Sequence, residues 1–148
     1  IGTKDGRDIL RGEILREGSD AVLLAIGPVI STCLAVAESL AHDGYSVGVA
    51  DARWIKPLDG ALLDKLRGTP IITVEENTLP GGFGAGVIEY YADHGGLDDL
   101  RIRRMGFPDR YIDHATREEQ LAEIGLDFDS IAAAARELVG QRIPHPVS

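Results

Sequence analysis

A strand-like segment, a glycine-rich turn and a helix-like segment follow one another at residues 73–91 (TVEENTLPGGFGAGVIEYY). This order is typical of loops that hold a phosphate group on the N–H groups of a helix N-terminus. Two acids, Glu75 and Glu76, stand directly before the turn. The first question that the sequence raises is therefore whether this turn binds a phosphate.

The glycine spacing matches neither of the two common phosphate-binding motifs. A dinucleotide-binding turn needs glycines at positions i, i+2 and i+5, and Val87 stands where the glycine after Gly82 and Gly84 should be. A P-loop needs a lysine and a serine or threonine after its last glycine, and two apolar residues stand there. Glu75 and Glu76 would also repel a phosphate placed nearby.

We therefore interpret the turn as a site of close packing. Gly82 and Gly86 are four residues apart, so they would leave one stripe of the helix without side chains. An apolar face would lie beside this stripe, formed by Phe83, Val87 and Tyr90. We expect the turn of residues 81–86 to start the helix and to approach another backbone closely, so that Gly82→Val damages folding or assembly.

Two cations follow the predicted second buried strand. Arg53 and Lys56 lie in the segment DARWIKPLD (51–59), just past the carboxyl end of that strand. Ligands of open α/β sheets usually bind at this edge, but a cation there can also neutralise acids on a neighbouring strand. We favour the second interpretation and predict that Arg53 forms a salt bridge with Glu75 or Glu76.

The histidines and the single cysteine form no recognisable reactive set. His42 and His94 lie near the predicted ends of helices, where the helix dipole favours a positive charge, and Cys33 stands within a helical pattern. His114 lies in a loop that could be a lid or a docking surface, although an ordinary loop histidine is the favoured interpretation. The residues alone therefore predict no catalytic, cofactor-binding or metal-binding side chain.

Apolar runs and helical periodicity alternate along the chain. Strands are predicted at 9–20, 21–27, 45–51, 70–76 and 100–106, and helices at 28–44, 61–66, 83–94 and 127–140, with a capping box at Thr116 and Glu119. This alternation predicts a three-layer α/β sandwich with about five strands, four of them parallel. The antiparallel strand is expected near an edge, from residues 12–17 or from the strand that begins at Leu100. Residues 1–11 are interpreted as a linker or arm, 12–140 as the domain and 141–148 as a tail.

The amino-acid composition excludes some classes of protein and disfavours some partners. The chain has 148 residues, 44% of them hydrophobic and 26% charged, and a net charge of −9. The negative charge disfavours nucleic acid and anionic membranes as partners, and no apolar run approaches the ~20 residues of a membrane span. A single cysteine allows no disulfide framework within the chain, which favours a reducing, cytoplasmic location.

Three stretches together resemble one enzyme family. The segments DARWIKPLD, TVEENTLPGGFGAGV and MGFPDRYIDHATREEQLAEIGLD are similar, in order and spacing, to the last domain of the 1-deoxy-D-xylulose-5-phosphate synthases. The first two segments also resemble the beta subunits of thiamine-dependent 2-oxo acid dehydrogenases and relatives of transketolase. A free-standing interaction or ligand-binding module with the same fold is a third possibility.

The resemblance implies part of a thiamine diphosphate enzyme that requires Mg²⁺ and condenses pyruvate with glyceraldehyde 3-phosphate, releasing carbon dioxide. In that family the cofactor and the catalytic residues belong to the preceding domains, so none is carried over here. The implied role is that of a scaffold and dimer contact, which is inactive alone. The positions that carry over as structural or interface residues are Asp51, Arg53, Lys56, Pro57, Asp59, Glu75, Glu76, Gly81, Gly82, Phe83, Gly84, Pro108, Asp109 and His114.

Overall fold

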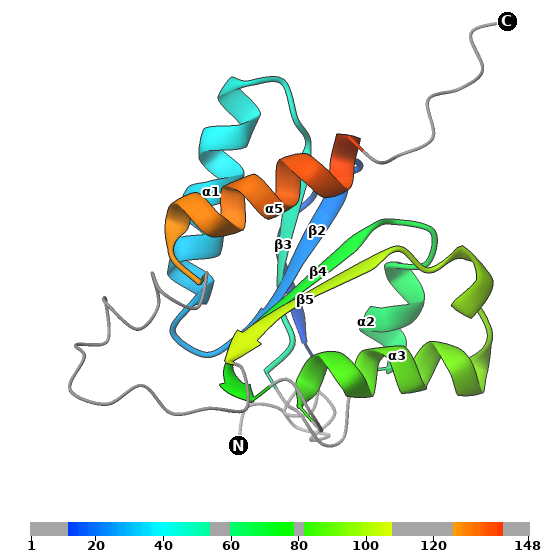
Figure 1. Cartoon of the computed structure of the whole chain (residues 1–148). Helices are drawn as coiled ribbons and strands as arrows, with labels where there is room; N and C mark the ends of the chain where they lie inside the picture. Colours follow the sequence, from blue (N-terminus) through cyan, green and yellow to red (C-terminus); the bar gives the residue numbers. More distant parts are fainter. Residues whose placement is uncertain (1–11, 54–59, 79–81, 108–125, 141–148) are drawn as a thin grey trace, which may run out of the picture.

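The computed structural model describes residues 12–53, 60–78, 82–107 and 126–140 (Figure 1). They form one five-stranded sheet with the strand order β1-β3-β2-β4-β5. The strands are β1 (Glu13–Arg16), β2 (Ala21–Ile26), β3 (Val47–Asp51), β4 (Ile71–Thr78) and β5 (Ile102–Phe107). The edge strand β1 pairs with β3 in the antiparallel sense, and the other neighbours are parallel. The predicted sheet is confirmed, and the antiparallel strand is the amino-terminal one.

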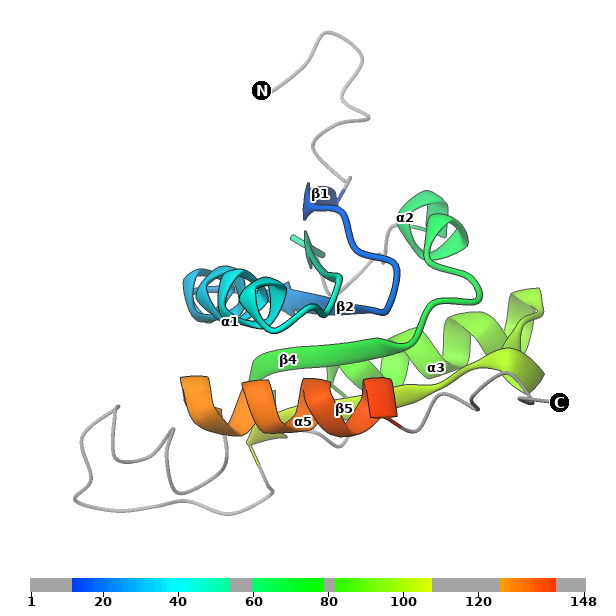
Figure 2. The same cartoon turned by 90° about the horizontal axis from the view of Figure 1, so that it is seen from above.

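Helices cover both faces of the sheet, as the prediction of three layers requires. Figures 1 and 2 show one pair of helices on one face and a second pair on the other. The first pair is α1 (Ile30–His42) and α5 (Phe128–Gly140), and the second is α2 (Gly60–Lys65) and α3 (Phe83–His94). A short 3₁₀ turn, η2 (Leu97–Asp99), was not predicted.

Side chains along each inner strand alternate between the two faces, because successive residues of a strand point in opposite directions. In β2, Leu23 and Ala25 belong to the core under α1 and α5. Val22 and Leu24 belong to the core under α2 and α3. Two-sided burial explains why the strand reads as a continuous apolar run rather than an alternating one.

Several predicted boundaries differ from the structure. Helix α1 begins at Ile30, two residues later than predicted, because Gly27 (φ +89°) and Pro28 form a turn that the Ile30 N–H closes onto the Gly27 carbonyl. Strand β4 extends to Thr78, two residues beyond the prediction. The amino-terminal arm, the capping box at residues 116–119 and the tail lie outside the described residues.

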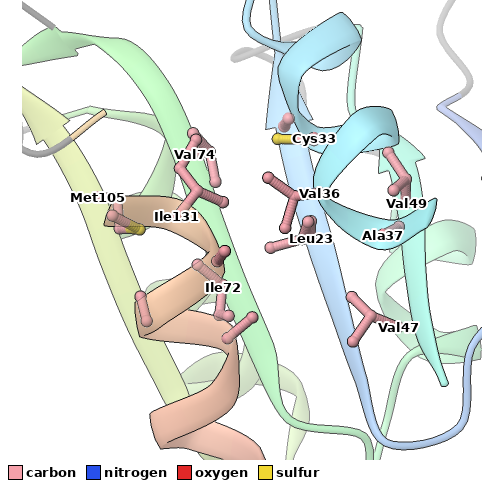
Figure 3. Packing of buried hydrophobic residues seen from close by; sticks show 14 of the residues in the cluster. Leu23, Cys33, Val36, Ala37, Val47, Val49, Ile72, Val74, Met105 and Ile131 are labelled. Atoms are coloured by element: carbon pink, nitrogen blue, oxygen red, sulfur yellow. The ribbon is translucent and has the colours of Figure 1, made fainter. Parts of the chain in front are cut away.

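Cys33 lies in the core between α1 and the sheet. Figure 3 shows its side chain in the same cluster as Val36 and Leu23, and it is fully buried. Burial raises the pKa of the Cys33 thiol to about 12, so the reactive thiolate is almost absent at neutral pH.

We expect thiol reagents to label native Cys33 at least about a hundredfold more slowly than the urea-unfolded chain, since labelling requires the helix to open. The measurement is the labelling rate with and without urea. Ser31 is exposed on the same helix, so the double variant Ser31→Cys/Cys33→Ser should label rapidly without denaturant. Equal rates for native Cys33 and this control would contradict the packing of α1.

Asp127 caps helix α5. Its carbonyl accepts the first helical hydrogen bond from Ile131, at 3.0 Å, and its carboxylate Oδ1 accepts the N–H of Ser130, also at 3.0 Å. Hydrogen bonds from the Ser130 side chain and then from its backbone lower the pKa of Asp127 from its ordinary value of 3.8. Since the pKa is lowered by folding, the cap stabilises the fold above that value, and the stabilisation is lost as the pH falls through the lowered pKa.

Replacing Asp127 by alanine should therefore cost about 1 kcal/mol of unfolding free energy at neutral pH. The difference from wild type should shrink progressively as the pH falls below the ordinary value of 3.8, because the wild-type carboxylate becomes protonated as the pH passes through its lowered pKa. Urea unfolding of both proteins over a series of pH values from neutral into the acid range measures this. A difference that stays constant with pH would show that the carboxylate charge has no part in the cap.

Candidate functional site: the turn between β4 and α3

Strand β4 presents two polar side chains to the face that α3 covers. Ile72 and Val74 belong to the core under α1 and α5, so the alternation of the strand directs Thr73 and Glu75 to the opposite face. Both polar residues are completely buried. Glu75 is the register partner of Ile26, the last residue of β2, so it lies toward the carboxyl ends of the parallel strands, where open α/β sheets usually hold their ligands.

The carboxylate of Glu75 bonds the amino terminus of α3. Its Oε1 accepts the backbone N–H of Phe83 at 2.9 Å, and its Oε2 accepts that of Gly84 at 2.8 Å. Gly82, the residue before the helix, has no side chain with which to cap these donors. A negative charge is favoured here by the helix dipole. The donors that a phosphate would use are therefore occupied by a carboxylate of the chain itself.

Close packing occurs in this turn at Gly84, where the nearest atoms are those of side chains and not of the backbone as predicted. A Cβ at Gly84 would lie 2.6 Å from Thr73 Oγ1 and 2.9 Å from Arg104 Cδ. Thr73 and Arg104 are register partners on β4 and β5. The first turn of α3 thus lies directly on two side chains of the sheet, and glycine is needed at position 84.

The buried face of α3 also differs slightly from the prediction. Phe83 and Val87 are buried as expected, but Tyr91 rather than Tyr90 completes the buried face. Tyr90 is only partly buried, at the border of the same core. A helix rotates 100° per residue, so the sequence spacing left both tyrosines possible.

The hydroxyl of Thr73 lacks a hydrogen-bond partner. It is the only buried side-chain oxygen or nitrogen without a partner among the residues that the structure describes. Such a group costs about 1–3 kcal/mol relative to a paired one. An unpartnered donor thus lies against Gly84, next to the two N–H groups that Glu75 binds.

The predicted salt bridge between Arg53 and Glu75 is wrong. The Arg53 guanidinium binds Glu13 of β1 at 2.7 Å, and the Arg53 N–H donates to Asp51 Oδ1 at 2.8 Å. The reason is the strand order: β1 lies beside β3, whereas β2 separates β3 from β4. The other predicted partner was Glu76, and its side chain lies outside the described part of the chain.

The Arg53 pair is a surface contact. The Arg53 and Glu13 side chains are 42% and 55% exposed, so the pair is worth only ~0–1 kcal/mol. Arg53→Ala therefore leaves the hydrogen bonds of the buried Glu75 in place. Arg53 also has a left-handed backbone conformation (φ +63°), which is uncommon outside glycine.

Other predicted positions fall outside the described residues. They are Lys56, Pro57, Asp59, Gly81, Pro108, Asp109 and His114. His42 and His94 are the last residues of α1 and α3, as predicted. Within the described ranges, no three His, Cys, Asp or Glu side chains gather in a way that could hold a metal ion.

No pattern in the sequence indicated that the side chain of Arg67 binds the carboxyl end of α3. Arg67 donates to Asp64 at 3.0 Å, to the carbonyl of His94 at 3.2 Å and to the carbonyl of Gly95. Its guanidinium lies 5.4 Å from the ring centre of Tyr91. The spacing of Asp64 and Arg67 was visible in the sequence, but their link to α3 depends on tertiary structure.

The hydroxyls of two tyrosines of α3 donate hydrogen bonds to residues of helix α2. The Tyr90 hydroxyl donates to Asp64 at 2.9 Å, and this hydrogen bond, followed by those from Arg67, lowers the pKa of Asp64. The Tyr91 hydroxyl donates to the Leu63 carbonyl at 2.6 Å, and burial raises the pKa of Tyr91 to about 12. Helix α3 is therefore fixed at both ends, by Glu75 and by Arg67.

Comparison with known proteins identifies relatives across nearly the whole chain. A family model described as transketolase, C-terminal domain, matches residues 10–131. The 1-deoxy-D-xylulose-5-phosphate synthase of Geobacillus thermodenitrificans is 46% identical over 132 residues, which are 88% of this chain and 21% of that protein. The synthase of Magnetococcus marinus is 46% identical over 136 residues, 90% of this chain and 22% of that protein. The chain thus spans about a fifth of the length of these curated relatives.

A solved structure has the same fold. It is a split-gene transketolase described as an inactive β4 tetramer, with a TM-score of 0.80 and 27% identity, covering 90% of this chain and 43% of that one. Among the described residues, no helix has the length and apolarity needed to cross a lipid bilayer.

Proposed function

Because the chain belongs to the family of transketolase C-terminal domains, we propose that it is the C-terminal domain of a 1-deoxy-D-xylulose-5-phosphate synthase. The observation that carries this proposal is 46% identity to synthases over almost all of the chain. The whole enzyme would join pyruvate to glyceraldehyde 3-phosphate, with loss of carbon dioxide, in a transketolase-type transferase reaction that supplies isoprenoid, thiamine and pyridoxal synthesis.

In this proposal the chain is a scaffold and a dimer contact, and it is inactive alone. Thiamine diphosphate and Mg²⁺ would belong to the preceding domains. Two observations on the described residues support this assignment: no three His, Cys, Asp or Glu side chains gather there as a metal site would require, and Glu75 occupies the donors at the start of α3. Residues 12–140 would form the domain, with 1–11 as the linker and 141–148 as the tail.

The partners would be the preceding domains of the same polypeptide and a second copy of the full-length enzyme in the cytoplasm. Neither nucleic acid nor a membrane is proposed as a partner. The interface residues would include Arg53, Lys56, Asp109 and His114. Glu75 and Gly84 would act inside the domain, by fixing the turn between β4 and α3.

A second candidate is a separately encoded subunit. The similarity to a split-gene transketolase favours this candidate, because that protein has the same fold and comes from a split gene. In that case the gene product would have a mass near the 15.9 kDa of this chain. A 2-oxo acid dehydrogenase beta subunit would instead copurify with an acyltransferase core.

The direct test is to express the natural gene product that contains this chain and to supply it with pyruvate, glyceraldehyde 3-phosphate, thiamine diphosphate and Mg²⁺. We expect release of carbon dioxide and formation of a five-carbon deoxy sugar phosphate. A full-length product that acylates a lipoyl carrier, or that transfers two-carbon units between sugars without releasing carbon dioxide, would contradict the proposal.

A further inference from the structure

We propose that the first turn of α3 is a carboxylate-binding pocket whose resident ligand is the side chain of Glu75, and that a free small carboxylate takes the same place when Glu75 is shortened. This inference is independent of the proposed enzyme function. It concerns the turn between β4 and α3, which has the strand–turn–helix order of a phosphate-binding loop but not its glycine spacing.

The donors of this pocket are arranged for a carboxylate. Successive N–H groups, of Phe83 and Gly84, bind the two separate oxygens of one carboxylate at 2.9 and 2.8 Å. Two parallel N–H···O bonds to one planar group give both strength and geometric selectivity. Glu75 is completely buried, so the site excludes water that would compete for these donors.

A third donor is available to a ligand that is not attached to the strand. The buried hydroxyl of Thr73 has no partner and lies against Gly84. Glu75 is held at a fixed distance from its own backbone and makes no bond with this hydroxyl. A free carboxylate can shift toward Thr73 and accept a hydrogen bond from its hydroxyl while it keeps the hydrogen bonds from the two N–H groups.

The size of the pocket selects among anions. The variant Glu75→Ala would remove Cγ, Cδ, Oε1 and Oε2, which correspond one for one to the four heavy atoms of acetate. Phosphate is tetrahedral and has more oxygens than the pocket has donors, and each unpaired buried oxygen is costly. We therefore expect acetate, and to a lesser degree formate, to bind the variant in preference to phosphate.

The experiment measures the melting temperature of Glu75→Ala during titration with sodium acetate, against sodium chloride at equal ionic strength. A rise of about 5 °C is expected when acetate reaches about ten times its dissociation constant, and the melting temperature should keep rising with the logarithm of the acetate concentration beyond that. Wild type has the pocket filled and should shift no more in acetate than in chloride. The matched control is Glu89→Ala, at an exposed position of the same helix, and it should behave as wild type does.

Two further measurements keep the proposal open to refutation. Should Glu75→Ala be largely unfolded, acetate and not phosphate is expected to restore its helical circular dichroism signal. Adding Thr73→Val to Glu75→Ala should weaken acetate binding several-fold, because the third donor is removed. The proposal would be refuted if acetate shifted the melting temperatures of wild type and Glu75→Ala equally, or if acetate failed to refold an unfolded variant. It would also be refuted if phosphate stabilised the variant as strongly as acetate does.

Discussion

Replacing Glu75 by glutamine is expected to lower the free energy of unfolding by about 2–4 kcal/mol, although the two side chains have the same shape. The Glu75 carboxylate is buried and binds the N–H groups of Phe83 and Gly84 with both oxygens. Glutamine offers a single oxygen, and its amide NH₂ would face the other N–H. One buried donor would thus lose its partner, and the favourable charge at the start of α3 would be lost as well.

Chemical denaturation of wild type and Glu75→Gln measures this difference. Glu89→Gln makes the same chemical change at an exposed position of α3 and should stay within about 0.5 kcal/mol of wild type. If the two variants were equally stable, the hydrogen bonds of Glu75 would not be what holds α3 to the end of β4.

Replacing Gly84 by alanine should destabilise the fold by about 1–3 kcal/mol, although alanine is the better helix former. The added Cβ would lie 2.6 Å from Thr73 Oγ1 and 2.9 Å from Arg104 Cδ. Arg104 can adjust part of its long side chain, but Thr73 is short and buried, so α3 would have to move away from the sheet.

A double variant separates this clash from a general effect on the helix. Thr73→Ala removes the oxygen nearest to the new methyl group, so the pair Gly84→Ala/Thr73→Ala should recover at least about 1 kcal/mol relative to the sum of the single variants. Gly140→Ala is the control, because a Cβ there meets no atom within 4 Å. Strictly additive effects of the two substitutions would refute the contact.

The sheet could be predicted because its inner strands are buried on both sides. The run of residues 21–26 is apolar throughout and that of residues 71–74 is interrupted only by Thr73, which is the mark of a parallel sheet between helix layers. Helix α3 was predicted with its observed ends, since glycines stand on both sides of a periodic apolar pattern. The edge strand left two choices, because both candidate segments alternate.

The role of Glu75 was only half visible in the sequence. Period-two alternation from Ile71 places Thr73 and Glu75 on one face, but no local pattern says which helix covers that face. From the sequence, Glu75 was interpreted as a charge that repels phosphate. In the structure its carboxylate itself occupies the place of an anion at the N-terminus of α3, where it accepts hydrogen bonds from two backbone N–H groups.

The error in the predicted Arg53–Glu75 pair has a different origin. A cation after one strand and an acid after the next strand along the chain suggest a pair, but the sheet inserts β2 between those two strands. Strand order depends on crossover connections, which local residue patterns do not encode. The antiparallel edge strand then supplied the partner, Glu13.

The proposal that this chain has no cofactor site of its own is tested most directly by calorimetry with thiamine diphosphate. Thiamine diphosphate and Mg²⁺ are titrated into the purified chain and, in parallel, into the full-length gene product. Catalysis by this cofactor needs prearranged groups around the metal, the diphosphate and the reacting carbon. We expect saturable binding to the full-length protein and no binding heat from the chain alone. Micromolar binding to the isolated chain, or release of carbon dioxide from pyruvate by it, would contradict the account.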